Sequence, residues 1–418
     1  MKKNKKMNMM TISLTEDLWT LILSRLPLKS IATSKLVCKH WKSIAESQFL
    51  RKHFLSHHQN SHSSWSVMWR DGRNKNAPEE VVAHYGCDVW GLPRSLGSYV
   101  SSFINSMTTT KTQEVRVLAY TEVGLILISS KEPVNYNPTY YVANPISRKY
   151  VEIPPLPVHR KVYYFNPTGL VTRIENGELL GYKVVLMDSS KCGKGVLSLL
   201  IYSSETCKWS FKTLRSSLPL SLVYWQQSVS MSGNLHWAGT TADKKYAIVS
   251  HDFYATGTES DRCRVTINPD VENFKDDYKG GVWTSSQGFL MLMNILEEDK
   301  LKVWRLKSGE WEHVSQISSV CFKPDFNDIF PLAMNRFDGE TLYLSSENHK
   351  RQKRKRLVST NLYNKGKLGL HNKLERTSDG LTLSFTMASS IMERSIYDSE
   401  LCTFVLPRWL YRIPSSPS

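Results

Sequence analysis

Each of five glycines in this chain is followed by a short apolar run, and the five recur at nearly even intervals. The runs are GLILI at Gly124, GELLGY at Gly177, GNLHW at Gly233, GFLML at Gly288 and GETLYL at Gly339. Successive glycines are 53, 56, 55 and 51 residues apart, and GLTLSF at Gly380 follows 41 residues later. A single glycine before a strand indicates only a turn. A repeat of about 40 to 55 residues with several short strands per unit predicts a β-propeller.

Three further segments, 141–153, 199–211 and 301–314, share a strand–turn–strand pattern. Aligned on their aromatic residues Tyr150, Trp209 and Trp311, all three have an apolar residue eight positions earlier and Ser or Thr three positions earlier. Each unit therefore contains about four strands, and the region after residue 60 accommodates about six blades. Two stacked β-sandwiches are the alternative, but they would not require so regular a period. We expect the closing segment 402–414 to complete a sheet with early strands, near residues 103–120.

The first sixty residues have the periodicity of short helices instead. Apolar residues recur at helical spacing at Leu14, Leu18, Leu21, Ile22 and Leu26. Ser13 and Glu16 predict a capping box at the start of this helix, and Pro27 ends it. We expect three more short helices, at about 28–35, 36–44 and 48–57.

These short helices carry more apolar side chains than their own core can cover. In the segment LVCKHWKSI, the residues Val37, Trp41 and Ile44 fall on one helical face. A unit of about fifty residues buries only about 60% of its unfolded surface. The surplus points either to a partner protein or to the chain's own second domain, and the pattern alone leaves both open.

Residues 13–54 resemble an F-box. The resemblance rests on the L-x-E-D-L opening at Leu14, on I-L-S-R-L-P at 22–27, on V-C-K-x-W at 37–41, and on a looser match around Ser47 and Phe49. The family usually has Pro where this chain has Thr15, a change that weakens the helix start slightly. The resemblance implies docking on the Skp-type adaptor of a cullin ubiquitin ligase. The adaptor-facing set that it implies is Leu14, Leu18, Ile22, Leu26, Pro27, Val37, Trp41 and Ile44.

The rest of the chain resembles the F-box-associated domain of plant F-box proteins, a degenerate relative of the kelch propellers. The matching segments are NPISRKYVEIPPLP at 144–157, YSSETCKW at 202–209, SGNLHWAG at 232–239 and the R-W-L motif at 408–410. The family's implied role for this domain is target capture. The predicted fold class is α+β and multidomain: a small helical F-box followed by a mainly β domain, a propeller of about six blades. The predicted boundaries are a basic disordered tail at 1–10, the F-box at 11–58, a junction at 59–75 and the propeller-like domain at 76–414.

The basic charge of the chain is concentrated in two places. Lys plus Arg number 54 against 38 for Asp plus Glu, a net charge of +16. Ten of these charges belong to the N-terminal lysines and to the run KRQKRKR: Lys350, Arg351, Lys353, Arg354, Lys355 and Arg356. The run interrupts an alternating region, so we expect a loop that serves nuclear import, contacts an acidic partner or is simply solvated. Aromatic residues do not interleave with the charges, so nucleic acid is not an expected partner.

The seven cysteines are scattered and form no CxxC pair, which favours free thiols in a reducing compartment. The N-terminus lacks the apolar region of a secretory signal, and no apolar run is long enough to span a bilayer. We therefore expect a cytoplasmic or nuclear protein, or one present in both compartments, without a membrane partner.

The sequence contains no motif for catalysis or for a cofactor. It has no GxSxG segment, and the glycines of KCGKGV lack the Lys-Ser/Thr ending of a phosphate-binding loop. The pairs His53/His57 and His58/His62 have zinc-ligand spacing, but no acidic or Cys ligand accompanies them, and a polar linker is the preferred interpretation. We expect no metal, no cofactor and no enzymatic activity.

The combined patterns predict the substrate-recognition subunit of a Skp–cullin–F-box ubiquitin ligase, which captures an unidentified target protein for ubiquitination. In the alternative, the propeller is a small-ligand binder, a glycan binder or an enzyme, and the helical unit merely packs against it. No substrate-binding residue is assigned. Trp225, His236 and Trp237 are candidates only if they are exposed on propeller loops.

Overall fold

The structure is a computed structural model that describes residues 14–71, 79–108, 110, 113–132, 138–157, 169–188, 195–222, 228–268, 281–295, 300–318, 328–348, 354–363, 368–370, 374–376, 382–385 and 399–414. The chain divides into two compact units. The helical unit comprises Met1–Ser63, Cys87–Leu92 and Arg408–Leu410. The β unit comprises Ser64–Gly86, Pro93–Pro407 and Tyr411–Ser418. No helix in the described ranges is both long and apolar enough to cross a membrane.

The helical unit contains α1 (Glu16–Leu23), α2 (Leu28–Ser34), α3 (Lys39–Glu46) and α4 (Gln48–His57). Ser13 of the predicted capping box lies outside the described residues, and the N-cap of α1 is instead Thr15, whose side chain makes no capping hydrogen bond. The third helix begins later than predicted. Cys38 caps it, its Sγ accepting a hydrogen bond from the Trp41 N–H at 3.4 Å. Leu36 and Val37 consequently lie in the turn before α3.

Two segments from distant parts of the sequence complete the helical unit. The Leu28 N–H donates to the carbonyl oxygen of Val89 at 2.8 Å, which ties the start of α2 to the segment 87–92. The ring of Trp409 lies 5.4 Å from that of Phe54 on α4. A short helical unit thus gains apolar contacts that its own fifty residues do not supply.

The β unit is built from antiparallel blades, five of which follow one another along the chain. The first two are formed by β3 (Glu114–Tyr120), β4 (Ile126–Lys131), β5 (Thr139–Asn144) and β6 (Lys149–Glu152), and by β7 (Gly169–Glu175), β8 (Glu178–Met187), β9 (Val196–Ser203) and β10 (Lys208–Ser216). The third is formed by β12 (Val229–Met231), β13 (Asn234–Thr241), β14 (Tyr246–Asp252) and β15 (Arg262–Ile267), with β11 (Leu220–Leu222) beside β13. The last two are formed by β16 (Val282–Ser286), β17 (Phe289–Ile295), β18 (Lys300–Lys307) and β19 (Glu310–Ser318), and by β20 (Asp328–Met334), β21 (Thr341–Asn348), β22 (Arg354–Asn361) and β23 (Leu368–Leu370). A short parallel pairing of β10 with β15 joins two of these blades into one sheet.

The two ends of the β unit form a further blade together. Its strand order is β24 (Leu374–Arg376), β25 (Thr382–Phe385), β2 (Glu79–Tyr85), β1 (Trp65–Asp71) and β26 (Ser399–Val405). The N-terminal hairpin is therefore inserted between strands from the C-terminal end. The prediction that the C-terminal segment joins early strands is confirmed, but the partner is β1 and not the region near 103–120. The strand β1 also begins inside the segment that was predicted as a junction.

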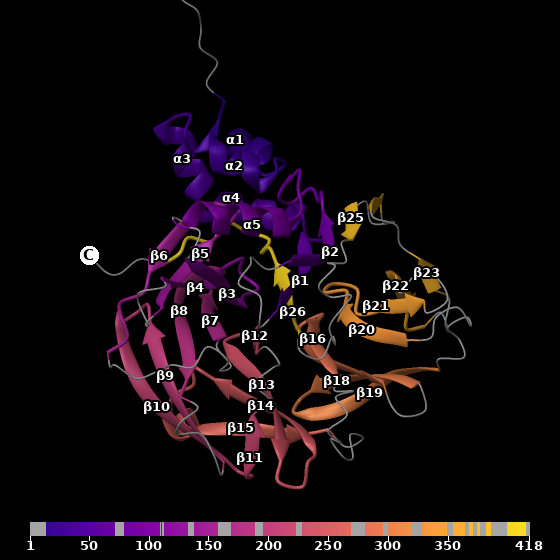
Figure 1. The fold of residues 1–418 in the computed structure, drawn as a ribbon. Helices are drawn as coiled ribbons and strands as arrows, with labels where there is room; N and C mark the ends of the chain where they lie inside the picture. The colour runs from indigo at the N-terminus through magenta and orange to yellow at the C-terminus, as the bar shows by residue number, and fades with distance from the viewer. Residues whose placement is uncertain are drawn as a thin grey trace, which may run out of the picture. The chain divides into compact units, whose positions relative to one another are not determined.

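The innermost strands of the described blades close a ring. Each of β26, β3, β7, β12, β16 and β20 contacts the next, and β20 returns to β26 (Figure 1). The predicted propeller of about six blades is confirmed in the described residues. The helix α5 (Leu96–Met107) packs against β1 and β2 and was not predicted. Its first turn is held by Glu80, whose Oε1 accepts a hydrogen bond from the Gly97 N–H at 2.7 Å.

The repeated glycines have a common structural cause. Each lies in the hairpin turn between the first and second strands of a blade, with φ of +75° at Gly124, +73° at Gly177, +80° at Gly233, +79° at Gly288 and +67° at Gly339. This left-handed region is readily available only to glycine. In three of these turns the preceding residue also has positive φ, which matches the right-handed twist of the strands. Gly380 lies outside the described residues.

Candidate functional site

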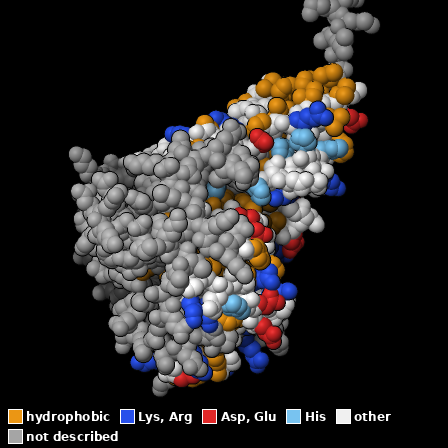
Figure 2. All heavy atoms as spheres, turned by 90° about the vertical axis from the view of Figure 1, so that its right-hand side faces the viewer, with side chains coloured by type: hydrophobic (Ala, Val, Ile, Leu, Met, Phe, Trp, Pro, Cys, Tyr) orange, Lys and Arg blue, Asp and Glu red, His pale blue; other side chains and the backbone are white. Residues whose placement is uncertain are grey.

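The helical unit exposes several large apolar side chains. Leu18, Leu21 and Ile22 on α1 are each 45% exposed, whereas Leu36 and Val37 in the turn before α3 are 85% and 64% exposed. Figure 2 shows hydrophobic side chains gathered on the surface of this unit. We call Leu18, Leu21, Ile22, Leu36 and Val37 the apolar surface. Exposed apolar groups gathered in this way are typical of a protein-binding surface.

The structure separates the predicted adaptor-facing residues by burial. Leu18, Ile22 and Val37 are exposed, and the partly exposed members of the set are Leu14, Leu26, Pro27 and Trp41. The ring of Trp41 packs at 4.8 Å on that of Trp19, so its own chain covers part of it. Ile44 is 0% exposed, which makes it a core residue, and its assignment to a partner-facing set is wrong in this structure. Leu21 and Leu36 are also exposed, although the resemblance to the F-box family did not place them in the adaptor-facing set.

The histidines with zinc-ligand spacing pack against aromatic rings. The ring centroids of His53 and Phe49 are 4.5 Å apart, and those of His58 and Phe54 are 4.4 Å apart. Burial lowers the pKa of His58, and the neighbouring His57 lowers it further. Among the described residues no group of three or more His, Cys, Asp or Glu side chains could hold a metal ion.

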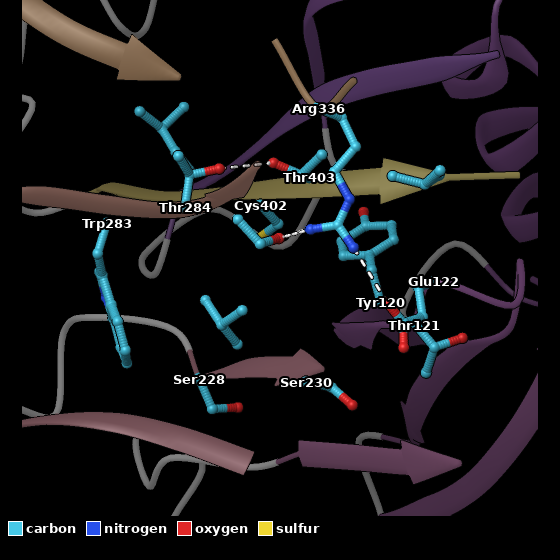
Figure 3. A pocket seen from close by; sticks show the side chains of 14 residues that line it. Tyr120, Thr121, Glu122, Ser228, Ser230, Trp283, Thr284, Arg336, Cys402 and Thr403 are labelled. Atoms are coloured by element: carbon cyan, nitrogen blue, oxygen red, sulfur yellow. Dashed lines mark hydrogen bonds and ion pairs between the residues drawn. The ribbon is translucent and has the colours of Figure 1, made fainter. Parts of the chain in front are cut away.

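A second candidate site lies inside the propeller, where five of the six innermost strands or the turns after them meet. We call it the channel pocket, a cavity of about 50 Å³. The residues that line it are Tyr120, Thr121, Glu122, Ser228, Val229, Ser230, Trp283, Thr284, Ser285, Arg336, Leu401, Cys402, Thr403 and Val405 (Figure 3). Half of them carry a hydroxyl group, and the charged residues among them are Glu122 and Arg336.

Arg336 is the electrostatic centre of this pocket. Only 9% of it is exposed, and burial lowers the pKa of its guanidinium, while Glu122 opposes that change. Its Nη2 lies 3.0 Å from Oε2 of Glu122, and its Nη1 donates to the hydroxyl of Ser285. The other oxygen of Glu122 accepts from the Ser232 N–H at 3.0 Å. These contacts connect turns from three blades. A buried charge requires a charged or hydrogen-bonding partner, and both Arg336 and Glu122 have one.

The remaining polar groups are spread around the pocket. The hydroxyls of Thr284 and Thr403 are 3.2 Å apart, and Figure 3 shows Ser228 and Ser230 across the pocket from Arg336. Trp283 is only 6% exposed, so it forms a wall and not a free stacking face. Glu122 and Arg336 were not predicted as site residues. The signal that could have found them is their position, within three residues before the repeated glycines Gly124 and Gly339.

The aromatic residues considered for target capture are largely inside the β unit. Trp237 is 1% exposed and belongs to an apolar core cluster, and His236 is 7% exposed. Nδ1 of His236 lies 2.7 Å from the Ser250 hydroxyl, and burial lowers its pKa to about 4. Trp225 lies outside the described residues.

The last three residues of the basic run lie in a strand and not in a loop. Arg354, Lys355 and Arg356 are the first residues of β22 and pair with β21, because the alternating strand pattern begins earlier than predicted. Lys350, Arg351 and Lys353 lie outside the described residues.

Comparison with known proteins finds two matching family models. The model described as "F-box domain" matches residues 12–53, and the model described as "F-box protein At3g26010-like, beta-propeller" matches residues 63–415. Three similar relatives are from Arabidopsis thaliana. F-box protein At3g28330 is 42% identical over 100% of this chain and 99% of its own length. Putative F-box protein At3g28280 is 44% identical over 69% of this chain and 89% of its own length. F-box protein At3g26010 is 32% identical over 97% of this chain and 92% of its own length.

Proposed function

This chain belongs to the family of F-box proteins with an At3g26010-like β-propeller, and on that premise we propose that it is the substrate-recognition subunit of a Skp–cullin–F-box ubiquitin ligase. The helical unit docks on a Skp-type adaptor, and the propeller captures the target protein. The chain itself makes and breaks no bond. It acts by raising the concentration of the target near the ubiquitin-carrying enzyme.

The observation that carries the proposal is the apolar surface of the helical unit. Five large apolar side chains on so small a unit are costly to leave in water, and a partner helix or groove relieves that cost. Trp41 lies partly exposed beside Trp19, and aromatic residues of this kind are frequent binding hot spots. We propose that Leu18, Ile22 and Val37 contact the adaptor, with Trp41 as an anchor and with Leu14, Leu26 and Pro27 contributing at partial exposure.

The test is calorimetric titration of the full chain with a purified Skp-type adaptor. We expect Leu18→Asp to lower the affinity by about 30-fold or more, equivalent to about 2 kcal/mol, because it places a carboxylate in an apolar contact. The matched control is Leu180→Asp, since Leu180 on β8 is 42% exposed against 45% for Leu18. Equal affinities for both folded variants and the wild type would exclude the apolar surface as the adaptor site.

A ubiquitin-ligase role is consistent with the cytoplasm or the nucleus, and we propose that the run 350–356 directs nuclear import. Imaging of a fluorescent fusion tests this second point. Alanines at Arg354, Lys355 and Arg356 should shift the fusion to the cytoplasm, and an unchanged distribution would show that the run has another role.

A further inference from the structure

The channel pocket is polar but electrically balanced. Its lining contains one guanidinium, that of Arg336, and one carboxylate, that of Glu122, and the two are paired at 3.0 Å. A second carboxylate entering the pocket would be repelled by Glu122, and an ammonium group would be repelled by Arg336. A neutral polar group meets neither penalty.

The hydrogen-bonding groups of the pocket offer donors and an acceptor next to one another. A guanidinium has five N–H groups, and the two contacts to Glu122 and Ser285 use only part of that capacity. Ser285 accepts from Arg336, so its own O–H can donate to a ligand. Each oxygen of Glu122 accepts one hydrogen bond, from Arg336 or from the Ser232 N–H, and a carboxylate oxygen can accept a second.

The cavity also limits the size of the group that can enter. About 50 Å³ is room for roughly four water-sized atoms, at about 10–15 Å³ each. That is enough for a carboxamide and its neighbouring carbon. The buried wall formed by Trp283 closes the pocket on one side.

We propose that the channel pocket recognises a side-chain primary amide, from Asn or Gln, of the target protein. The amide oxygen accepts from Arg336 or Ser285, and the amide NH2 group donates to Glu122. A buried site made to hydrogen-bond a particular group rejects analogues that leave its own polar groups unpaired. The inference rests on the proposed function, because it assumes that the propeller is the part of the chain that captures the target.

The test uses saturation-transfer NMR on the full chain with two probes of the same shape. They are N-acetylglutamine N-methylamide and N-acetylglutamate N-methylamide, which differ by an amide NH2 against a carboxylate oxygen. We expect the glutamine probe to bind at least about tenfold more tightly than the glutamate probe. Equal binding of the two probes, tighter binding of the glutamate probe, or no binding of either would overturn the proposal.

Variants locate the binding in the pocket. Glu122→Gln removes the anion while Arg336 stays charged, so the preference should reverse toward the glutamate probe. The matched control is Glu312→Gln, which breaks a similar pair on blade strands β18 and β19, where Arg305 lies 2.7 Å from Glu312, and which should keep the wild-type preference. If Glu122→Gln fails to fold, Ser285→Ala keeps both charges and should weaken glutamine-probe binding several-fold. Wild-type binding in Ser285→Ala, or a reversed preference in Glu312→Gln, would refute the assignment.

The adaptor titration keeps the two proposals separate. A preparation that binds the adaptor but not the glutamine probe overturns the amide site and leaves the ubiquitin-ligase role standing. A preparation that binds the glutamine probe but not the adaptor removes the ubiquitin-ligase role, and with it the claim that the amide belongs to a ubiquitination target.

Discussion

Removal of the Trp409 side chain should destabilise the helix α4, which lies more than 350 residues earlier in the sequence. Trp409 is 9% exposed and lies with its ring 5.4 Å from Phe54, which is itself fully buried in α4. A buried Trp removes about 200 Å² from water, which at about 25 cal/mol per Å² corresponds to an upper limit of about 5 kcal/mol. Core Trp→Ala substitutions cost about 3–5 kcal/mol, so we expect Trp409→Ala to cost about 3 kcal/mol.

Hydrogen–deuterium exchange of the α4 amides measures this effect directly, because it reports the opening free energy of one segment. A loss of about 3 kcal/mol should raise the exchange rate in Gln48–His57 by roughly 150-fold. Strands β17 and β18 provide an internal reference in the same sample, and their exchange should stay unchanged. Trp409→Phe is the matched control, since it keeps an aromatic ring against Phe54 and should lower the opening free energy of α4 much less. Unaltered exchange of α4 in a folded Trp409→Ala protein would refute the assignment of this residue to the helical unit.

Three other predictions concern the β unit. Gly288→Ala should lower the free energy of unfolding in urea by about 1–2 kcal/mol, because φ there is +79°. No atom lies within 4 Å of the added Cβ, so the loss comes from the backbone alone, and an unchanged urea midpoint would contradict this explanation. Tyr343→Phe should cost about 1–3 kcal/mol, because its hydroxyl lies 2.7 Å from Nε2 of the buried His84 between two blades; a neutral result would show that the bond contributes nothing net. His236 should make stability depend on pH, since burial lowers its pKa from 6.5 to about 4. The folded-state pKa is below the unfolded one, so this stability is fully present above pH 6.5 and about 3 kcal/mol of it is lost as the pH falls toward 4. His236→Gln should flatten that slope in unfolding curves measured across the interval, and an equal slope would contradict the assignment.

The repeat of the propeller could be predicted from its turns. A hairpin between the first two strands of a blade requires a left-handed residue, and glycine meets that requirement in every described copy. The spacing of Gly124, Gly177 and Gly233 therefore reports the length of a blade directly. The apolar periodicity of the helices was equally informative, although the start of α3 was misplaced because Cys38 caps the helix and not a residue nearer Leu36.

Contacts between distant segments were less accessible to sequence reasoning. The burial of Ile44 and the exposure of Leu36 depend on how neighbouring helices pack, and both residues look alike in a helical pattern. The partner of β26 was predicted wrongly because several early strands have the same alternating character. The helix α5 was missed because its small and polar residues weaken the apolar signal of its buried face.

The sequence by itself determined the local geometry of this protein: short helices at the start, then blades whose first two strands are joined by a glycine turn. These features depend on φ, ψ and neighbouring side chains, which a few consecutive residues specify. The tertiary structure alone decided which strands close the ring, why Trp409 belongs with Phe54, and that Glu122 meets Arg336 across the channel. Residues 214 positions apart form that ion pair only because the blades close in a circle, and no local preference of either residue encodes such a contact.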